Sequence, residues 1–169
     1  YKMILKNISK NFYINLIFII LIFLLDRISK IYVIDLSNKA LISEIFSSKF
    51  LNINLIWNEG IAFGFFSFNQ NYWYNFLTLI ILAVILIVFV MMIKSSGIKK
   101  YSLLMIFSGA LGNLYDRFFY KAVPDFIDFH IGEFHWFIFN LADIFITIGV
   151  IFMIISELIG NNKKKYEQI

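Results

Sequence analysis

The chain has 169 residues and a mass of 19.9 kDa, and 60% of its residues are hydrophobic while only 15% are charged. A compact soluble domain of this size has too little interior to bury so much apolar surface, so the composition excludes a soluble enzyme, a disordered segment and a nucleic-acid-binding module. The net charge is +4 and cysteine is absent, which excludes a disulfide framework, a thiol nucleophile and an iron–sulfur cluster.

Four segments have the roughly 20 mostly apolar residues that a transmembrane helix needs. In chain order they are expected at about 12–34, 73–93, 101–119 and 136–159. The first has a basic start like that of a signal peptide, but it lacks a small-x-small cleavage site and continues into charged residues. We therefore interpret it as a retained span and the whole chain, 1–169, as one integral membrane domain.

The connection between the first two spans contains Leu51-Asn52-Ile53-Asn54-Leu55, in which apolar and polar residues alternate strictly. This alternation is typical of a strand with one buried face. A turn is expected next, over 57–60. The apolar and aromatic segment 61–66 then predicts a stretch that lies at the membrane interface.

Basic residues are concentrated on one side of the predicted spans. They lie at the N-terminus, in the connection between the second and third spans, and at the C-terminus: Lys2, Lys6, Lys10, Lys94, Lys99, Lys100, Lys163, Lys164 and Lys165. Because Lys and Arg collect in cytoplasmic loops, both termini are predicted to be cytoplasmic and the two longer connections to face outward.

Polar side chains in and beside the spans converge on the outward ends. They are Asp26, Arg27, Lys30, Asn113, Asp116, Arg117, Asp125, Asn140 and Asp143. A charge at the centre of a bilayer costs at least about 2.5–3.5 kcal/mol, so this clustering predicts one polar site near the outer leaflet. Asp26 and Lys30 are four residues apart and predict a structural ion pair on one helix face.

Two smaller features of the sequence concern packing and metal binding. Gly109 and Gly112 predict close helix packing in the third span. Asp128, His130, Glu133 and His135 resemble a sparse metal cluster but match no metal-binding spacing, so we interpret them as ordinary loop residues.

Asp125 and Asp143 form the most informative pair. One follows the third span and the other lies just inside the fourth, so adjacent helix ends can bring them together. Two close carboxylates cannot both ionise easily, so one can take a proton from water while the other donates to a carbonyl oxygen. This predicts aspartic-protease chemistry. A proton-coupled transporter subunit that uses Asp26, Asp116 and Asp143 as a relay remains an alternative, as does an assembly protein whose charges only pair helices.

Five motifs in chain order resemble those of the lipoprotein signal peptidase (signal peptidase II) family of bacterial membrane aspartic proteases. They are D-x-x-[ST]-K at 26–30, N-x-G-x-A-F at 58–63, G-x-x-G-N-x-x-D-R at 109–117, V-x-D-F at 123–126 and F-N-x-A-D at 139–143. The resemblance covers nearly the whole chain. It implies an endopeptidase that cuts diacylglyceryl-modified prolipoproteins on the N-terminal side of the lipidated Cys.

The resemblance also implies roles for individual residues. Asp125 and Asp143 are expected to be the catalytic pair. Expected substrate-positioning residues are Asn58, Asn113, Arg117 and Asn140, and expected structural supports are Asp26, Lys30, Gly60 and Asp116.

The fold that the resemblance implies is an all-α membrane protein with four transmembrane helices, a small outward β-cradle and a short interfacial helix. The expected location is the bacterial inner membrane, with the site near its outer face. We expect no cofactor, metal or nucleic-acid partner, contact with membrane lipid, and a monomer.

Overall fold

The computed structural model describes residues 2–40, 44–60 and 71–166, so the expected interfacial segment at 61–66 lies outside the described residues. The described chain forms four helices, α1 (Lys2–Ala40), α2 (Asn71–Lys94), α3 (Gly97–Phe119) and α4 (Leu141–Tyr166). It also forms four strands, β1 (Glu44–Ser47), β2 (Leu51–Asn58), β3 (Val123–Ile131) and β4 (Phe134–Phe139). The fold is therefore mostly helical with a small sheet.

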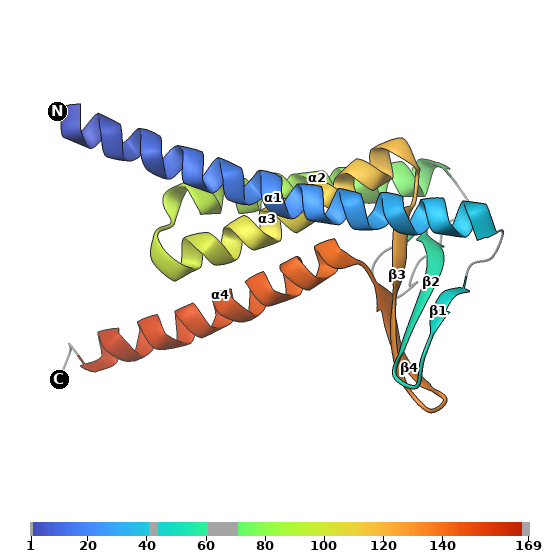
Figure 1. Cartoon of the computed structure of the whole chain (residues 1–169). Coiled ribbons are helices and arrows are strands. Elements are labelled where there is room, and N and C mark those ends of the chain that lie inside the picture. The colour runs from blue at the N-terminus through green and yellow to red at the C-terminus, as the bar shows by residue number, and fades with distance from the viewer. Residues whose placement is uncertain (1, 41–43, 61–70, 167–169) are drawn as a thin grey trace.

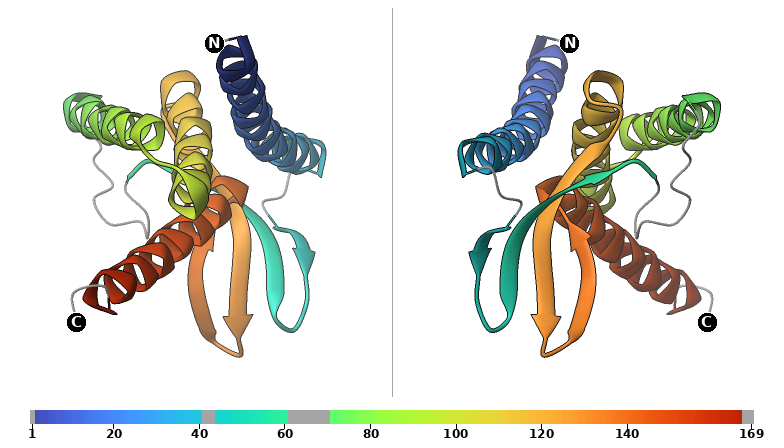
Figure 2. Two further views of the ribbon diagram at one scale, coloured as in Figure 1. Left: turned by 90° about the vertical axis from the view of Figure 1, so that its left-hand side faces the viewer. Right: turned by 90° about the vertical axis from the view of Figure 1, so that its right-hand side faces the viewer.

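The sheet lies at one end of the helices. The two termini and the connection between α2 and α3 lie at one end, and the sheet projects from the other (Figure 1). Viewed along the helices, the two hairpins extend together away from the bundle (Figure 2). The basic segments of the sequence are thus gathered at the end remote from the sheet.

The sheet is antiparallel in the order β1-β2-β3-β4. The strand predicted at 51–55 is confirmed as part of β2, while β3 and β4 fall where the sequence indicated only a connection and the start of the fourth span. The fourth helix therefore begins at Leu141, and the predicted start at 136 is wrong. Residues 134–139 are mostly aromatic or β-branched and pair with β3, so they form a strand. Asn140 follows the strand and caps the helix.

Within the described residues, two helices are long and apolar enough to cross a membrane by length and composition, Tyr74–Lys94 and Leu141–Ile159. Large apolar side chains also remain exposed along α1, as at Ile17, Ile28 and Ile31. A water-soluble surface rarely carries so continuous an apolar area, so these faces are suited to lipid contact.

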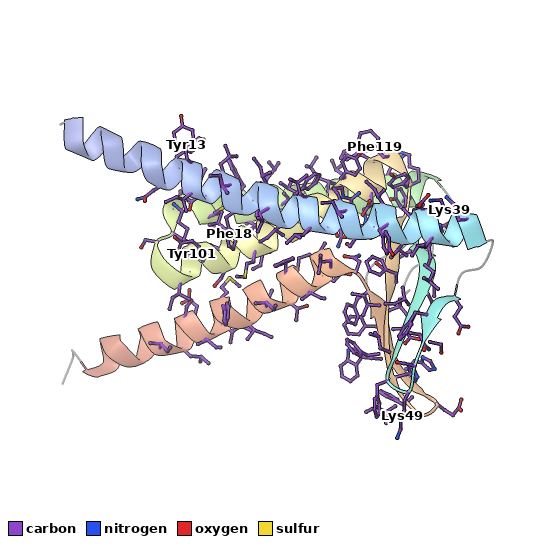
Figure 3. All side chains as sticks on the ribbon, viewed as in Figure 1. Tyr13, Phe18, Lys39, Lys49, Tyr101 and Phe119 are labelled. Carbon is purple, nitrogen blue, oxygen red and sulfur yellow. The ribbon has the colours of Figure 1, made fainter. Side chains whose placement is uncertain are left out.

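Helix α3 packs against the other three helices and brings them together. Its Leu103 and Leu104 are buried with Met92 of α2. Phe18 of α1 and Tyr101 of α3 approach each other with ring centroids 6.1 Å apart (Figure 3).

Close packing at the two predicted glycines is confirmed. A Cβ on Gly109 would lie 2.5 Å from the carbonyl oxygen of Ala142 in α4, and one on Gly112 would lie 2.5 Å from Oδ2 of Asp26 in α1. Only glycine permits α3 to approach both neighbours this closely, and both contacts lie beside the polar site.

Candidate active site

A cluster of four charged side chains joins α1 to α3. Asp26, Arg27, Lys30 and Asp116 are each at most 7% exposed. Lys30 Nζ lies 2.9 Å from Asp26 Oδ1 and 2.7 Å from Asp116 Oδ2, which confirms the predicted Asp26–Lys30 pair and extends it. Two cations and two carboxylates balance, as burial of charge requires.

Arg27 was predicted to lie in the polar site, but the sequence indicated no partner for it. Its guanidinium donates to both oxygens of Asp116 and to Asp26 Oδ2, the latter over 2.7 Å. It also lies over the ring of Tyr115, 4.7 Å from the centroid. The available signal was that a planar, always-charged guanidinium inside a predicted span requires carboxylate partners.

The N-terminus of α4 places Asp143. Asn140 precedes the helix, and its Oδ1 accepts the N–H of Asp143 over 3.2 Å, while Asp143 Oδ2 accepts the N–H of Asn140 over 3.1 Å. This reciprocal pair is a capping box, here with Asn and Asp in the two positions. The N–H of Ala142 donates to Asp26 Oδ1 over 3.1 Å, which attaches the same helix end to the charge cluster.

Asp125 lies on β3 and receives two amide hydrogen bonds. Asn140 Nδ2 donates to its Oδ1 over 2.6 Å, and Asn58 Nδ2 donates to its Oδ2 over 2.9 Å. Asn113 Nδ2 donates to Asp143 Oδ1 over 2.8 Å. Each of the four carboxylate oxygens of Asp125 and Asp143 therefore accepts at least one N–H, so both side chains are held in place.

The three asparagines are themselves held by their carbonyl oxygens. Asn113 Oδ1 accepts from Lys30 Nζ over 2.8 Å, and Asn58 Oδ1 accepts from the N–H of Gly60 over 3.0 Å. Asn140 Oδ1 accepts from Asp143, as described above. Because each carbonyl has its own donor, the amide groups cannot rotate by half a turn without losing a bond. The asparagines thus present N–H groups to the carboxylates.

Arg117 connects α3 to the residues after β2. Its Nη2 donates to the carbonyl oxygen of Gly60 over 3.1 Å, and its Nη1 donates to that of Asn113 over 3.2 Å. Its Nε is buried and has no hydrogen-bond partner among the described residues.

Asp125 and Asp143 share a cavity of about 250 Å³, which Asn58, Asn113 and Arg117 also line. Asp143 in addition reaches an apolar groove of about 540 Å³, walled by Phe134, Phe137, Phe139 and Ile148. Asp125 reaches a second groove of about 740 Å³, walled by Trp57, Glu59 and Ile138. The pair lies where an apolar groove and a more polar groove meet, and Phe137 borders all three spaces.

Burial raises the pKa of Asp125 from 3.8 to about 6, and the nearby charge of Asp143 adds to this effect. The amide hydrogen bonds from Asn58 and Asn140 act in the opposite direction. A carboxyl with this pKa can hold a proton under mildly acidic conditions and can exchange it near neutrality.

The interpretation of Asp128, His130 and His135 as loop residues is wrong, since all three lie in paired strands. Only Glu133 lies in the turn between β3 and β4. Asp128 is buried on the β3–β4 hairpin and bonds to His135, so these residues form a cluster of their own apart from the carboxylate pair.

Comparison with known proteins identifies a family. The family model for signal peptidase II matches residues 18–159. The "Lipoprotein signal peptidase" of Pelagibacter ubique (strain HTCC1062) is 49% identical over 94% of this chain and 96% of its own length. That of Anaplasma marginale (strain Florida) is 41% identical over 89% of this chain and 87% of its own. A solved bacterial membrane enzyme is 32% identical, with a TM-score of 0.70 over 89% of this chain and 90% of that one.

Proposed function

Because the chain belongs to the signal peptidase II family, and so removes signal peptides from prolipoproteins as an aspartic endopeptidase, we propose that Asp125 and Asp143 are its catalytic pair. The observation that carries this proposal is the shared cavity in which both carboxylates lie, each held by fixed amide donors. The same geometry disfavours a proton relay, since Asp26 and Asp116 are tied to two cations.

The two carboxylates have different surroundings, which assigns them different roles. Asp143 accepts a backbone N–H at the N-terminus of α4, and the positive end of the helix dipole favours its ionised form. Burial raises the pKa of Asp125 to about 6, so we assign the shared proton to Asp125. Asp143 is therefore the base that takes a proton from the attacking water, and Asp125 is the acid that donates to the scissile carbonyl oxygen.

The two grooves match the two parts of a lipid-modified substrate. The apolar groove beside Asp143 has aromatic and aliphatic walls and suits the acyl chains of a diacylglyceryl-modified Cys. The larger groove beside Asp125 carries more polar groups and suits the peptide. The outer edge of β4 borders both grooves, and an extended peptide can pair with such an edge through main-chain hydrogen bonds.

The assay that tests this function is incubation of the purified protein with a diacylglyceryl-modified prolipoprotein. We expect a loss of mass equal to that of the signal peptide. An unprocessed substrate, in the presence of folded protein, would contradict the proposal.

We further propose that all four helices span the bacterial inner membrane, with both termini cytoplasmic and the sheet outside. Lysines concentrate at the end of the bundle that holds the termini, and the sheet projects from the other end (Figure 1). A reporter fused after Lys165 should behave as cytoplasmic, and one inserted next to Lys39 should behave as external. The opposite pattern would exclude this orientation, and two reporters on the same side would exclude three membrane crossings between Lys39 and Lys165.

The raised pKa of Asp125 predicts how cleavage depends on pH. Cleavage should fall as pH rises through about 6, because the pair then loses the proton that Asp125 donates. The free energy of unfolding should also fall as pH rises. The folded state binds the proton of Asp125 more tightly than the unfolded state, so this carboxyl favours folding less as pH rises from about 4 to about 6.

Initial cleavage rates from pH 4 to pH 9 measure this dependence, with thermal unfolding followed over the same range as the control for loss of folded protein. A rate that instead rises through pH 6 and stays level above it would show that Asp125 acts in its ionised form.

A further inference from the structure

The hairpin formed by β3 and β4 carries a second group of functional side chains. His130 and His135 are directly opposite each other across the two strands, and they are the only histidines in the sequence. Their rings stack with centroids 4.9 Å apart and an interplanar angle of 19°. Asp128 lies two residues before His130 on β3, and one ligand atom from each of the three residues falls within 4.8 Å of the others.

The described residues satisfy only part of the hydrogen bonding of this group. Asp128 is 2% exposed, and among the described residues its ion-pair partner is His135, whose Nδ1 lies 2.9 and 3.0 Å from the two carboxylate oxygens. His130 Nδ1 is buried and has no hydrogen-bond partner within the described part of the chain. A buried carboxylate and a buried ring nitrogen without a partner are both costly.

We propose that Asp128, His130 and His135 bind a Zn²⁺ ion, with water in the fourth position. Zn²⁺ prefers imidazole nitrogen and carboxylate oxygen in tetrahedral arrangement, and two imidazoles disfavour Mg²⁺ and Ca²⁺, which select oxygen ligands. The metal would balance the buried charge of Asp128 and give the orphaned nitrogen of His130 a partner. The three ligand atoms lie within 4.8 Å of one another, and shifts on the order of 1 Å would bring them to the roughly 3.3 Å separation of ligands around a tetrahedral Zn²⁺ ion.

The backbone fixes the geometry of this group. Gly132 occupies the first position of the two-residue turn with a φ of 59°, which is the conformation that a tight hairpin turn demands there. This turn sets the register that places His130 opposite His135. The ladder is irregular between Asp128 and His130, and such a bulge redirects side chains. The N–H of His130 also donates to the carbonyl oxygen of Phe50 over 3.1 Å, which ties the group to the neighbouring hairpin.

The position of the site gives the ion a structural role close to the substrate. His130 lines the apolar groove that reaches Asp143, and His135 lines the groove that reaches Asp125. An ion held by both histidines would clamp β3 to β4 and fix the wall that the two grooves share. The site is separate from the carboxylate pair, so metal binding can fail while the proposed peptidase function stands.

The test uses the full chain in detergent micelles, purified with a tag that contains no histidine, stripped with a chelator and exchanged into chelator-free buffer. Because the chain has no cysteine and no other histidine, no competing imidazole or thiolate site is present. Co²⁺ is titrated first, and tetrahedral binding should produce visible d–d absorption that Zn²⁺ abolishes. Competition with a chromophoric zinc chelator then gives the stoichiometry and Kd.

We expect one Zn²⁺ per chain, a higher thermal unfolding temperature with Zn²⁺ and no effect of Mg²⁺ or Ca²⁺. His130→Ala, His135→Ala and Asp128→Asn should each weaken Zn²⁺ binding by at least about 10-fold. Glu133→Gln changes an acidic side chain in the same hairpin outside the group and should leave the Kd unchanged. The unfolding temperature of each metal-free variant shows that it is folded, and His130→Ala provides a readout even where the Asp128 variant is unstable.

Two results would overturn the site. One is wild-type protein that takes up no Zn²⁺ at micromolar concentration. The other is a folded His130→Ala/His135→Ala double variant that binds Zn²⁺ as tightly as the wild type, which would place the metal elsewhere.

Discussion

Asp125→Asn and Asp143→Asn should each reduce prolipoprotein cleavage by on the order of 10³-fold or more, because an amide can neither take a proton from water nor donate one as an acid. The double variant should be scarcely slower than either single one, since the two carboxylates act as a unit. Single-turnover cleavage by purified protein measures all three rates.

Stability should remain near that of the wild type in these variants, because two effects oppose each other. Loss of a buried negative charge favours folding, while an Asn at 125 must turn its own N–H₂ toward the amide of Asn58 or Asn140, both of which donate. Asp35→Asn alters an exposed carboxylate and should cleave at the wild-type rate. A folded Asn variant at 125 or 143 that retains wild-type turnover would exclude that residue from catalysis.

Asp26→Ala should lower the free energy of unfolding by about 3–5 kcal/mol, since it leaves Arg27 and Lys30 buried with one carboxylate between them. It also removes the acceptor of the Ala142 N–H and so loosens the N-terminus of α4. Thermal or denaturant unfolding in detergent measures the loss. Adding Lys30→Met should restore part of the stability, because the remaining charges then balance.

The chain supplies a matched control for this substitution. Asp35 and Lys39 form an ion pair at the same four-residue spacing on the same helix, but their side chains are 53% and 73% exposed. Asp35→Ala should therefore cost no more than about 0.5 kcal/mol. An Asp26→Ala protein that is as stable as Asp35→Ala but inactive would indicate that Asp26 acts in the chemistry and not in the support of the site.

Much of the helical part of the fold could be predicted, because an apolar segment of about 20 residues is typical of a membrane helix. The strands of the sheet were harder to predict. The alternation at 51–55 identified one strand. Residues 136–139 are continuously apolar, so their sequence fits the start of a membrane span as well as it fits a strand. The segment forms a strand because it pairs with β3. This pairing depends on the tight turn at Gly132 and on contacts between residues up to 12 positions apart, which the apolar pattern does not reveal.

The composition of the site was predictable, but its connections were not. Asp125 and Asp143 could be paired because one follows the third predicted span and the other lies just inside the fourth. The direct hydrogen bonds to the carboxylates could not be predicted, because they depend on side-chain geometry and not on sequence spacing. Their donors are Asn58, Asn113 and Asn140. Arg27 could be placed in the polar site, but its partners could not be predicted because it occupies a variable position of its motif. The grouping of Asp128, His130 and His135 could not be predicted because these residues meet only through cross-strand register.

The most direct test of the central claim compares two forms of one prolipoprotein, with and without the diacylglyceryl group on the Cys, as substrates of the purified wild-type protein. Mass spectrometry of the products locates the cleaved bond. The lipid-modified form should be cut at the bond immediately N-terminal to the modified Cys. The unmodified form should be cut far more slowly, because it cannot fill the apolar groove beside Asp143. Equal cleavage of both forms, or cleavage at a different bond, would contradict it.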